Sequence, residues 1–300
     1  MASVPLSIAR RLTANQCPQW AGLPLRRLHT SGTEHRTFAL GEEFIVRLPR
    51  DGDAEAGLVK EIAWWPRLGD ALPVEVPEVV YSGVPEEDTG RLGEAAAYPY
   101  RWAITRWVPG ADAAATVLDG GRTDGWPETL AAIVLALRSI DLGAIPVTHW
   151  PRGGRGGHLS DRLRALDETR DALAGPLDAT PLTPLIDAAL AVAPDPTPVL
   201  LHADLIPGNL VAREGRIVGL LDLGTLTTGY AAWDLTPAWW VLDRAGRDRF
   251  RALVDADDDS WAWGRAFAGT QGLLAHWYYT PRHHALVSFG ARAVREALAG

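Results

Sequence analysis

Residues 199–211 read VLLHADLIPGNLV, and residues 217–225 read IVGLLDLGT. Each stretch begins with an apolar run and then reaches an aspartate, Asp204 in the first and Asp222 in the second. The first stretch also contains a Pro-Gly turn that leads to Asn209. Apolar runs of this kind predict buried strands, so both carboxylates are expected where the core meets solvent, a common position for functional residues.

These three polar side chains can converge on one point from two adjacent strand ends. Asp222 and Asn209 offer the hard oxygen ligands that Mg²⁺ takes together with water and substrate phosphates. Asp204 is then left to orient a substrate hydroxyl and accept its proton. A single Asp in a turn is usually a cap or an Asx turn, but the order and spacing of the whole set favour the functional interpretation.

The composition is typical of a globular chain and limits its partners. The 300 residues are 47% hydrophobic and 22% charged, which suffices for one large or two modest domains. The net charge of −8 argues against general nucleic-acid binding, which needs a basic surface. No uncharged apolar run reaches about 18 residues and the N-terminus lacks a secretory signal, so we expect no membrane contact and a cytoplasmic location.

The pattern along the chain predicts a β-rich part followed by a mostly helical part. Beside a weakly helical N-terminus and one helix over 53–70, short β-like runs occur at 24–30, 36–40, 43–49, 77–85 and 99–108. Helical spacing then dominates at 123–141, 158–174, 181–193 and 231–299, with strands at 198–203, 209–213 and 216–222. The predicted class is α+β, with one domain at 1–107 and a second at 108–300.

The two opening stretches resemble the catalytic loop and the metal-binding segment of protein kinases, and more closely those of the aminoglycoside phosphotransferase family. That family, which includes macrolide and choline kinase-like enzymes, carries His-Gly-Asp, an Asn five residues later and an Asp-Phe-Gly-like strand end. HADLIPGNL and LLDLG match this order, with Ala203 in place of Gly and Leu223 in place of Phe. Further similar segments are SGTEHRTFAL, FIVRLP, KEIAWWPRL, RWAITRWVPG and WAWGRAFAGTQ.

The resemblance implies a protein-kinase-like bilobal fold and a small-molecule kinase. A small N-terminal lobe with an antiparallel sheet would bind ATP or GTP, and a larger, mostly helical C-terminal lobe would bind the acceptor. Asp204 would be the catalytic residue, and Asn209 and Asp222 would hold Mg²⁺. The reaction would move the γ-phosphoryl group to a hydroxyl, most readily that of an aminoglycoside, as in antibiotic resistance.

The resemblance also assigns the nucleotide contacts. Arg47 stands where the family has its phosphate-binding Lys, in a chain whose only lysine is Lys60, and Glu61 matches the glutamate that pairs with it. The remaining contacts are expected from the hydroxyl of the phosphate turn and from the linker backbone around the nucleotide base, namely Ser31, Thr105, Trp107 and Val108.

Two departures concern the loops around the site. The phosphate turn has a single Gly rather than the kinase G-x-G-x-x-G pattern. In the family's Gly-Asp-Pro-Ala-x-Asp-Leu motif, Tyr230 replaces the first Asp, whereas Asp234 is kept. We expect Asp234 to bond to the backbone of the catalytic loop.

The identity of the acceptor stays open at this point. The net charge and the acidic run at 255–259 favour a cationic hydroxylated molecule, although such a run is also typical of a solvated helix start. A macrolide, a peptide antibiotic or a hydroxylated metabolite are alternatives. Two other classes are a kinase-like protein that binds nucleotide without turnover and a metal-dependent hydrolase. The chain is expected to be a monomer or a homodimer.

Overall fold

The computed structural model describes residues 5–28, 34–87, 97–118, 120, 123–144, 154–173, 178–280 and 284–300. The chain divides into two compact units. Unit 1 comprises Met1–Asp70, Glu75–Pro109 and Leu220–Gly224. Unit 2 comprises Ala71–Val74, Gly110–Gly219 and Thr225–Gly300. The short segment 220–224 that returns to unit 1 carries Asp222.

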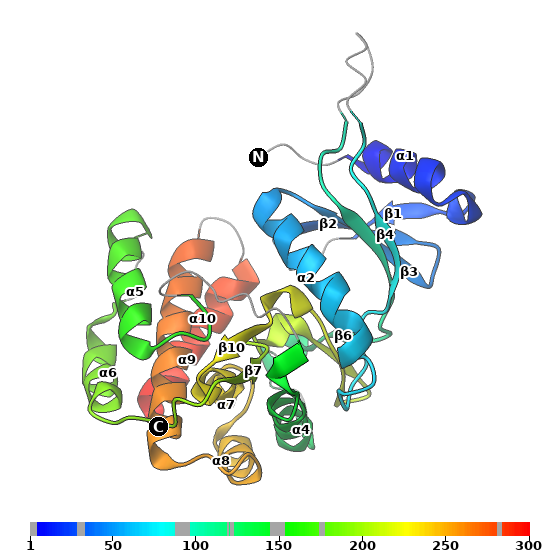
Figure 1. Cartoon of the computed structure of the whole chain (residues 1–300). Coiled ribbons are helices and arrows are strands. Elements are labelled where there is room, and N and C mark those ends of the chain that lie inside the picture. The colour runs from blue at the N-terminus through cyan, green and yellow to red at the C-terminus, as the bar shows by residue number, and fades with distance from the viewer. Residues whose placement is uncertain are drawn as a thin grey trace. The chain divides into compact units, whose positions relative to one another are not determined.

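Unit 1 is built on a five-stranded antiparallel sheet with the order β1-β2-β3-β5-β4 (Figure 1). Its strands are β1 (Leu25–Arg27), β2 (His35–Leu40), β3 (Phe44–Pro49), β4 (Val79–Gly83) and β5 (Trp102–Arg106). Its helices are α1 (Leu6–Gln16) and α2 (Gly52–Leu68). All five predicted β-like runs of the N-terminal part therefore form strands.

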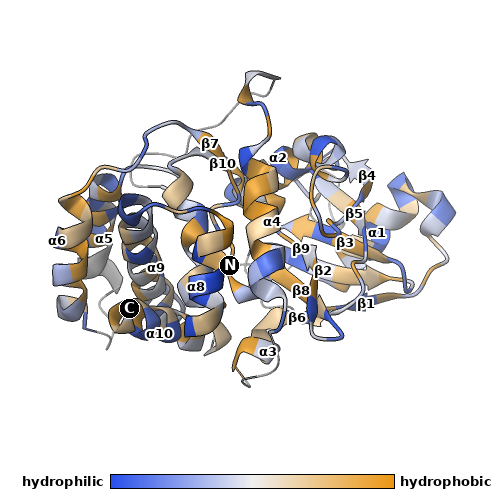
Figure 2. Ribbon diagram, turned by 90° about the horizontal axis from the view of Figure 1, so that it is seen from below, coloured by the Kyte–Doolittle hydropathy of each residue, from blue (hydrophilic) through white to orange (hydrophobic). Residues whose placement is uncertain are grey.

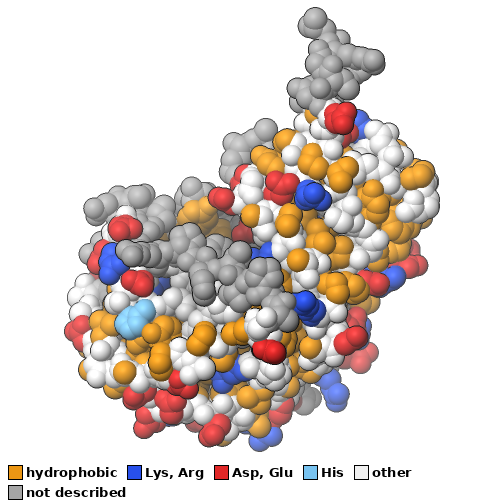
Figure 3. Space-filling view, in the orientation of Figure 1, with side chains coloured by type: hydrophobic (Ala, Val, Ile, Leu, Met, Phe, Trp, Pro, Cys, Tyr) orange, Lys and Arg blue, Asp and Glu red, His pale blue; other side chains and the backbone are white. Residues whose placement is uncertain are grey.

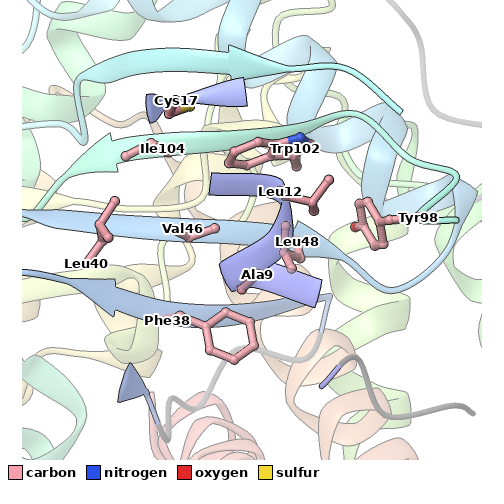
Figure 4. Packing of buried hydrophobic residues seen from close by; sticks show 10 residues of the cluster. All are labelled: Ala9, Leu12, Cys17, Phe38, Leu40, Val46, Leu48, Tyr98, Trp102 and Ile104. Atoms are coloured by element: carbon pink, nitrogen blue, oxygen red, sulfur yellow. The ribbon is translucent and has the colours of Figure 1, made fainter. Parts of the chain in front are cut away.

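The core of unit 1 lies on one face of this sheet, against α1. Figure 4 shows its buried side chains, which include Ala9, Leu12, Phe38, Leu40, Val46, Leu48, Trp102 and Ile104. Because successive side chains of a strand point to opposite faces, Arg47 points away from this core, between Val46 and Leu48. It pairs there with Glu61 of α2, so this predicted ion pair lies on the other face of the sheet.

The predicted helix at 53–70 is confirmed as α2. Its N-cap is Asp51, whose side chain accepts a hydrogen bond from the Ala54 N–H at 2.9 Å. The sequence predicts that Pro66 kinks or ends this helix, and α2 ends two residues later, at Leu68.

Unit 2 is mostly helical, as predicted. Its helices are α3 (Ala113–Leu118), α4 (Trp126–Arg138), α5 (Leu159–Leu173), α6 (Thr183–Leu190), α7 (Pro237–Trp240), α8 (Arg244–Leu253), α9 (Asp258–Tyr279) and α10 (His284–Ala299). Its short strands are β6 (Ala111–Asp112), β7 (Val199–Leu201), β8 (Leu210–Arg213), β9 (Arg216–Leu220) and β10 (Thr227–Gly229).

Helix α9 is the central helix of unit 2, with α5, α6 and α10 packed against it. Helix α4 is apolar along much of its length (Figure 2) and buries most of its side chains. No helix of the described residues is long and apolar enough to cross a membrane.

One prediction about the strands is wrong. The sequence predicts Asp204 and Asp222 at the ends of adjacent strands, but β7, which precedes Asp204, pairs with β10. Strand β9, which precedes Asp222, belongs to a separate sheet with the order β6-β8-β9. Both strands also end earlier than predicted, because Ala203 and Asp222 have left-handed φ angles of 61° and 62° that no strand accommodates.

Candidate active site

The loop after β7 turns sharply at Ala203, one residue before Asp204. A left-handed φ costs an L-residue about 1–2 kcal/mol, so this backbone needs support. The N–H groups of His202 and Ala203 donate to Asp234 Oδ2 and Oδ1 at 2.8 and 2.7 Å. Asp234 therefore bonds to the backbone of the loop that carries Asp204, as the resemblance predicts.

The support for this loop is a buried polar network. Asp234 is 1% exposed. Burial raises the pKa of Asp234, and His202, the two backbone donors and Arg138 oppose this shift. The fully buried His202 ring lies with Nδ1 3.5 Å from the Thr225 hydroxyl. Such a network holds one backbone geometry, because each buried polar group loses its partner if the loop moves.

Asp204 itself is held from two sides. Its side chain is 9% exposed. Asn209 Nδ2 donates to Asp204 Oδ2 at 2.9 Å and to the Asp204 carbonyl at 2.8 Å. On the other oxygen, Oδ1, Gln271 Nε2 donates at 2.9 Å and Arg155 Nη2 forms an ion pair at 2.9 Å. The carboxylate is thus fixed in orientation, as a base that must meet one substrate atom has to be.

The geometry of Asn209 fits a role as a magnesium ligand. Asn209 makes both hydrogen bonds to Asp204 through its amide nitrogen. These bonds do not use the amide oxygen of Asn209. Oxygen is the donor that Mg²⁺ requires. Among the described residues, no three His, Cys, Asp or Glu side chains gather to hold a metal, so phosphate oxygens and water would have to complete the coordination.

In unit 1, Arg47 and Glu61 form an ion pair across the gap between β3 and α2, with 12% and 1% of their side chains exposed. Burial alone would lower the pKa of Arg47, but the carboxylates of Glu61 and Asp222 outweigh it, so the pKa is raised. Asp222 therefore lies near the Arg47 charge within this unit. Arg47 stays protonated and forms one charged cluster with Glu61 and Asp222.

Three of the predicted nucleotide contacts, Thr105, Trp107 and Val108, lie in or just after β5. Thr105 lies within β5 and is bonded in the sheet between β3 and β4. The Trp107 N–H donates to the Glu43 carbonyl at 2.7 Å. Within the described part of the chain, the Val108 N–H has no acceptor, so Val108 is the linker residue best able to donate to a nucleotide base. Ser31 lies outside the described residues.

Tyr230, which replaces an acidic residue of the resembling motif, packs into an aromatic cluster. Its ring centroid lies 4.9 Å from that of Trp263 and 5.6 Å from that of His158. The substitution therefore exchanges a charged side chain for aromatic packing, and leaves the contacts of Asp234 intact.

The acidic run at 255–259 is a helix start. Asp257 is the N-cap of α9 and accepts from the N–H and the hydroxyl of Ser260 at 2.6 and 3.0 Å. Asp258 pairs with Arg251. In Figure 3 acidic side chains lie along the lower edge of the helical unit, where Figure 1 draws α8 and the start of α9. The run thus begins and caps a helix, which is one of the two interpretations that the sequence leaves open.

A comparison with protein families assigns most of the chain to one family. The model of the phosphotransferase enzyme family matches residues 26–267. The chain belongs to this family. The match includes every predicted site residue, from Ser31 to Asp222. No curated protein matches this family member in sequence.

Solved structures confirm the kinase-like α+β fold of this phosphotransferase family member. Aminoglycoside 2'-phosphotransferase-IIIa, solved with GDP, is 18% identical with a TM-score of 0.72, and the match covers 98% of each chain. The streptomycin–ATP complex of APH(2'')-IIa is 17% identical with a TM-score of 0.60, covering 97% of this chain and 95% of that one. Macrolide 2'-phosphotransferase from Brachybacterium faecium is 18% identical with a TM-score of 0.59, covering 96% and 98%.

Two residues at Asp204 are absent from the sequence predictions. Arg155 lies between glycines, in a stretch that is typical of a surface loop. Gln271 ends the segment WAWGRAFAGTQ, which resembles the family. That resemblance is the signal that could have identified Gln271, whereas Arg155 has no comparable motif.

Proposed function

We propose that this protein is a small-molecule kinase that transfers the γ-phosphoryl group of ATP or GTP to a hydroxyl. The observation that carries the proposal is the fixed Asp204 carboxylate, with Asn209 on one oxygen and a loop backbone bonded to Asp234. Membership of the phosphotransferase enzyme family supports it. Similar structures contain GDP, ADP or ATP, and their acceptors are aminoglycosides or macrolides.

In the proposed reaction, Asp204 orients the acceptor hydroxyl and takes its proton as the oxygen bonds to the γ-phosphorus. The bond between that phosphorus and the bridging oxygen breaks, and the nucleoside diphosphate leaves with the electron pair. Asn209 and Asp222 would hold Mg²⁺, which neutralises phosphate charge when bound. The protein contributes mainly position and electrostatics.

Unit 1 would bind the nucleotide in this scheme. Arg47, oriented by Glu61, contacts the phosphates, and the N–H of Val108 donates to the base. The chain region 108–300, apart from residues 220–224, would bind the acceptor.

A nucleotide-consumption screen tests the proposal. ATP and GTP would each be offered with aminoglycosides, macrolides, peptide antibiotics and hydroxylated metabolites. Acceptor-dependent release of ADP or GDP with a phosphorylated product is the expected result. Nucleotide binding without release for any acceptor would indicate a binding protein, and product formation without nucleotide would indicate a hydrolase.

Arg47→Lys should lower kcat/KM by about tenfold, because Lys keeps the charge but loses the planar fork that binds phosphate and carboxylate. Arg47→Ala should cost far more and should also lower the free energy of unfolding by about 3–5 kcal/mol, since the buried Glu61 loses its partner. Steady-state kinetics and urea denaturation measure the two effects. Arg101, which is exposed and bonds to Glu55 through its backbone N–H, is the matched control for both substitutions. Equal kinetics for Lys and Ala at position 47 would contradict the phosphate role.

Asp222→Asn should remove the effect of Mg²⁺ on nucleotide binding. Asn tolerates a left-handed φ, so the backbone at this position is kept while a charged ligand is lost. We expect the Mg²⁺-dependent gain in nucleotide affinity to fall by about tenfold or more, since even the hydrogen-bonding partners of metal ligands contribute that much. Titrations with and without Mg²⁺ measure it, and an unchanged metal dependence would show that Asp222 is no ligand.

A further inference from the structure

The Oδ1 atom of Asp204 lies in a cationic environment. Arg155 and Gln271 both contact this oxygen, at 2.9 Å each. Arg162, on α5, lies close enough for its charge to interact with Arg155 and with Asp204. Arg155 therefore lies on the oxygen of Asp204 that Asn209 does not contact, and the charge of Arg162 lies near both groups within unit 2. A site for a polycation would have the opposite charge pattern.

The loop that carries Arg155 is fixed against the rest of unit 2. A Cβ atom on Gly229 would lie 1.9 Å from the Gly156 carbonyl oxygen, so only two glycines allow the two backbones to approach this closely. The Tyr230 N–H donates to the Gly156 carbonyl at 3.2 Å, and Trp233 Nε1 donates to the Gly157 carbonyl at 2.8 Å. Backbone contacts of the neighbouring glycines therefore hold the loop in which Arg155 contacts Asp204.

Two buried polar atoms at this place lack a partner. Gln271 is 7% exposed, and its Oε1 atom has no hydrogen-bond partner among the described residues. Arg162 Nε is buried and likewise finds no partner within the described ranges, although its guanidinium lies over the Trp233 ring at 5.5 Å. Unpaired buried polar atoms are costly, and a ligand that carries both a hydroxyl and an anion would satisfy both.

The positive charge at this place persists at neutral pH and is not compensated from the acidic run. Burial lowers the pKa of Arg162 to about 10, with Arg155 adding to the shift, so the guanidinium remains protonated. Gln271 comes 14 residues after Asp257, which places them about 21 Å apart along α9 at about 1.5 Å per residue. This exceeds twice the Debye length of about 8 Å at physiological salt.

We propose that the acceptor carries an anionic group, a carboxylate or a phosphate, close to its reacting hydroxyl, and that Arg155 and Arg162 bind this group. The inference rests on the proposed function, because it takes Asp204 as the residue that faces the acceptor hydroxyl. Arginine suits the role, since its planar fork binds two oxygens of one oxyanion. The anion belongs to the acceptor, because Arg155 stands on Oδ1 of Asp204 while Asn209, the predicted metal ligand, stands on Oδ2.

Binding of the anion also bears on the reaction. Arg155 contacts Oδ1 of Asp204. An acceptor anion competes for this guanidinium and leaves Oδ1 to receive the hydroxyl proton. A neutral acceptor leaves Arg155 on the carboxylate, so it should show a lower kcat as well as a higher KM.

The test uses acceptors that are similar in shape but differ in charge, among them glucuronate, glucose and glucosamine, and N-acetylserine with its neutral amide. Binding is measured by calorimetry with Mg²⁺ and a non-hydrolysable nucleotide, and turnover with ATP or GTP. Anionic members should be preferred about 10- to 100-fold, the contribution of a charge-assisted hydrogen bond. Arg155→Gln and Arg162→Gln should each remove this preference and keep nucleotide affinity. Arg155→Lys and Arg162→Lys, which keep the charge, should retain part of it.

Arg164→Gln is the matched control, because Arg164 lies on α5 as well but is exposed and pairs with Asp161. A preference for cationic members, an anionic preference that survives in both Gln variants, or no binding of any anionic member would overturn the inference. Loss of nucleotide affinity in Arg155→Gln would assign this guanidinium to the donor phosphates and would overturn it too. Turnover of other acceptors in those cases leaves the proposed function standing. Anion binding that depends on both arginines, with no acceptor ever phosphorylated, would support the anion site and refute the kinase.

Discussion

Asp204→Asn is expected to lower kcat by about 10²–10⁴-fold, the usual contribution of a positioned general base, while nucleotide affinity stays within about twofold of the wild-type value. Asn keeps the shape of the side chain and can still accept one hydrogen bond from Gln271 or Asn209. It cannot take a proton from the acceptor, and it cannot balance the charge of Arg155. The loss should therefore appear in kcat rather than in the dissociation constant of the nucleotide.

Single-turnover kinetics with the best acceptor, and nucleotide titrations on the same variant, separate these two quantities. Asp187→Asn is the matched control, because Asp187 is exposed on α6 of the same unit. Wild-type turnover in the Asp204 variant would show that another group accepts the proton. A parallel loss of nucleotide affinity would instead place Asp204 among the nucleotide contacts.

Local patterns in the sequence predicted much of this molecule. Alternating apolar runs indicated the strands of unit 1, and helical spacing indicated α2, α4 and α5 within a few residues. The spacing between Asp204, Asn209 and Asp222 identified the candidate site, because each residue follows or precedes a short apolar strand. The prediction for Asp234 also succeeded, since its motif lies in a fixed order after the catalytic loop.

Local sequence patterns could not predict contacts between segments that are far apart in the chain. Strands β7 and β9 belong to separate sheets, and each is followed by left-handed backbone, at Ala203 and Asp222, a conformation that is uncommon for residues other than glycine. The contact of Arg155 with Asp204 depends on Gly156 and its close approach to a segment more than seventy residues later. No periodicity in the sequence carries such information, because it arises only when the two backbones meet.

The positive φ at Ala203 gives a physical meaning to the replacement of the family's Gly by Ala at this position. The resembling motif has Gly at this position, and Gly adopts a left-handed conformation without steric cost. Here an L-residue occupies the position, so the conformation depends on the two hydrogen bonds that Asp234 accepts. The loop that presents Asp204 is therefore expected to be unusually sensitive to the loss of Asp234.

Asp234→Ala should lower the free energy of unfolding by about 2–5 kcal/mol, because two buried backbone N–H groups and the Arg138 guanidinium lose an acceptor or a counter-charge. It should also lower kcat strongly, since Ala203 is then free to leave its left-handed conformation and carry Asp204 with it. Asp234→Asn keeps one acceptor oxygen, so its free energy of unfolding and its kcat should lie between those of the wild type and those of Asp234→Ala. Urea denaturation and steady-state kinetics on the same samples measure both effects.

The double variant Ala203→Gly, Asp234→Ala separates the two roles of Asp234. Glycine at this position removes the steric cost of the left-handed backbone, so it should restore part of the stability and part of kcat. Asp187→Ala, on the exposed face of α6, should change the free energy of unfolding by no more than about 0.5 kcal/mol. If Asp234→Ala is as stable and active as the wild type, the backbone at Ala203 is held by other contacts. If the added Ala203→Gly substitution restores stability but not kcat, Asp234 acts on catalysis through Arg138 or His202 rather than through the turn.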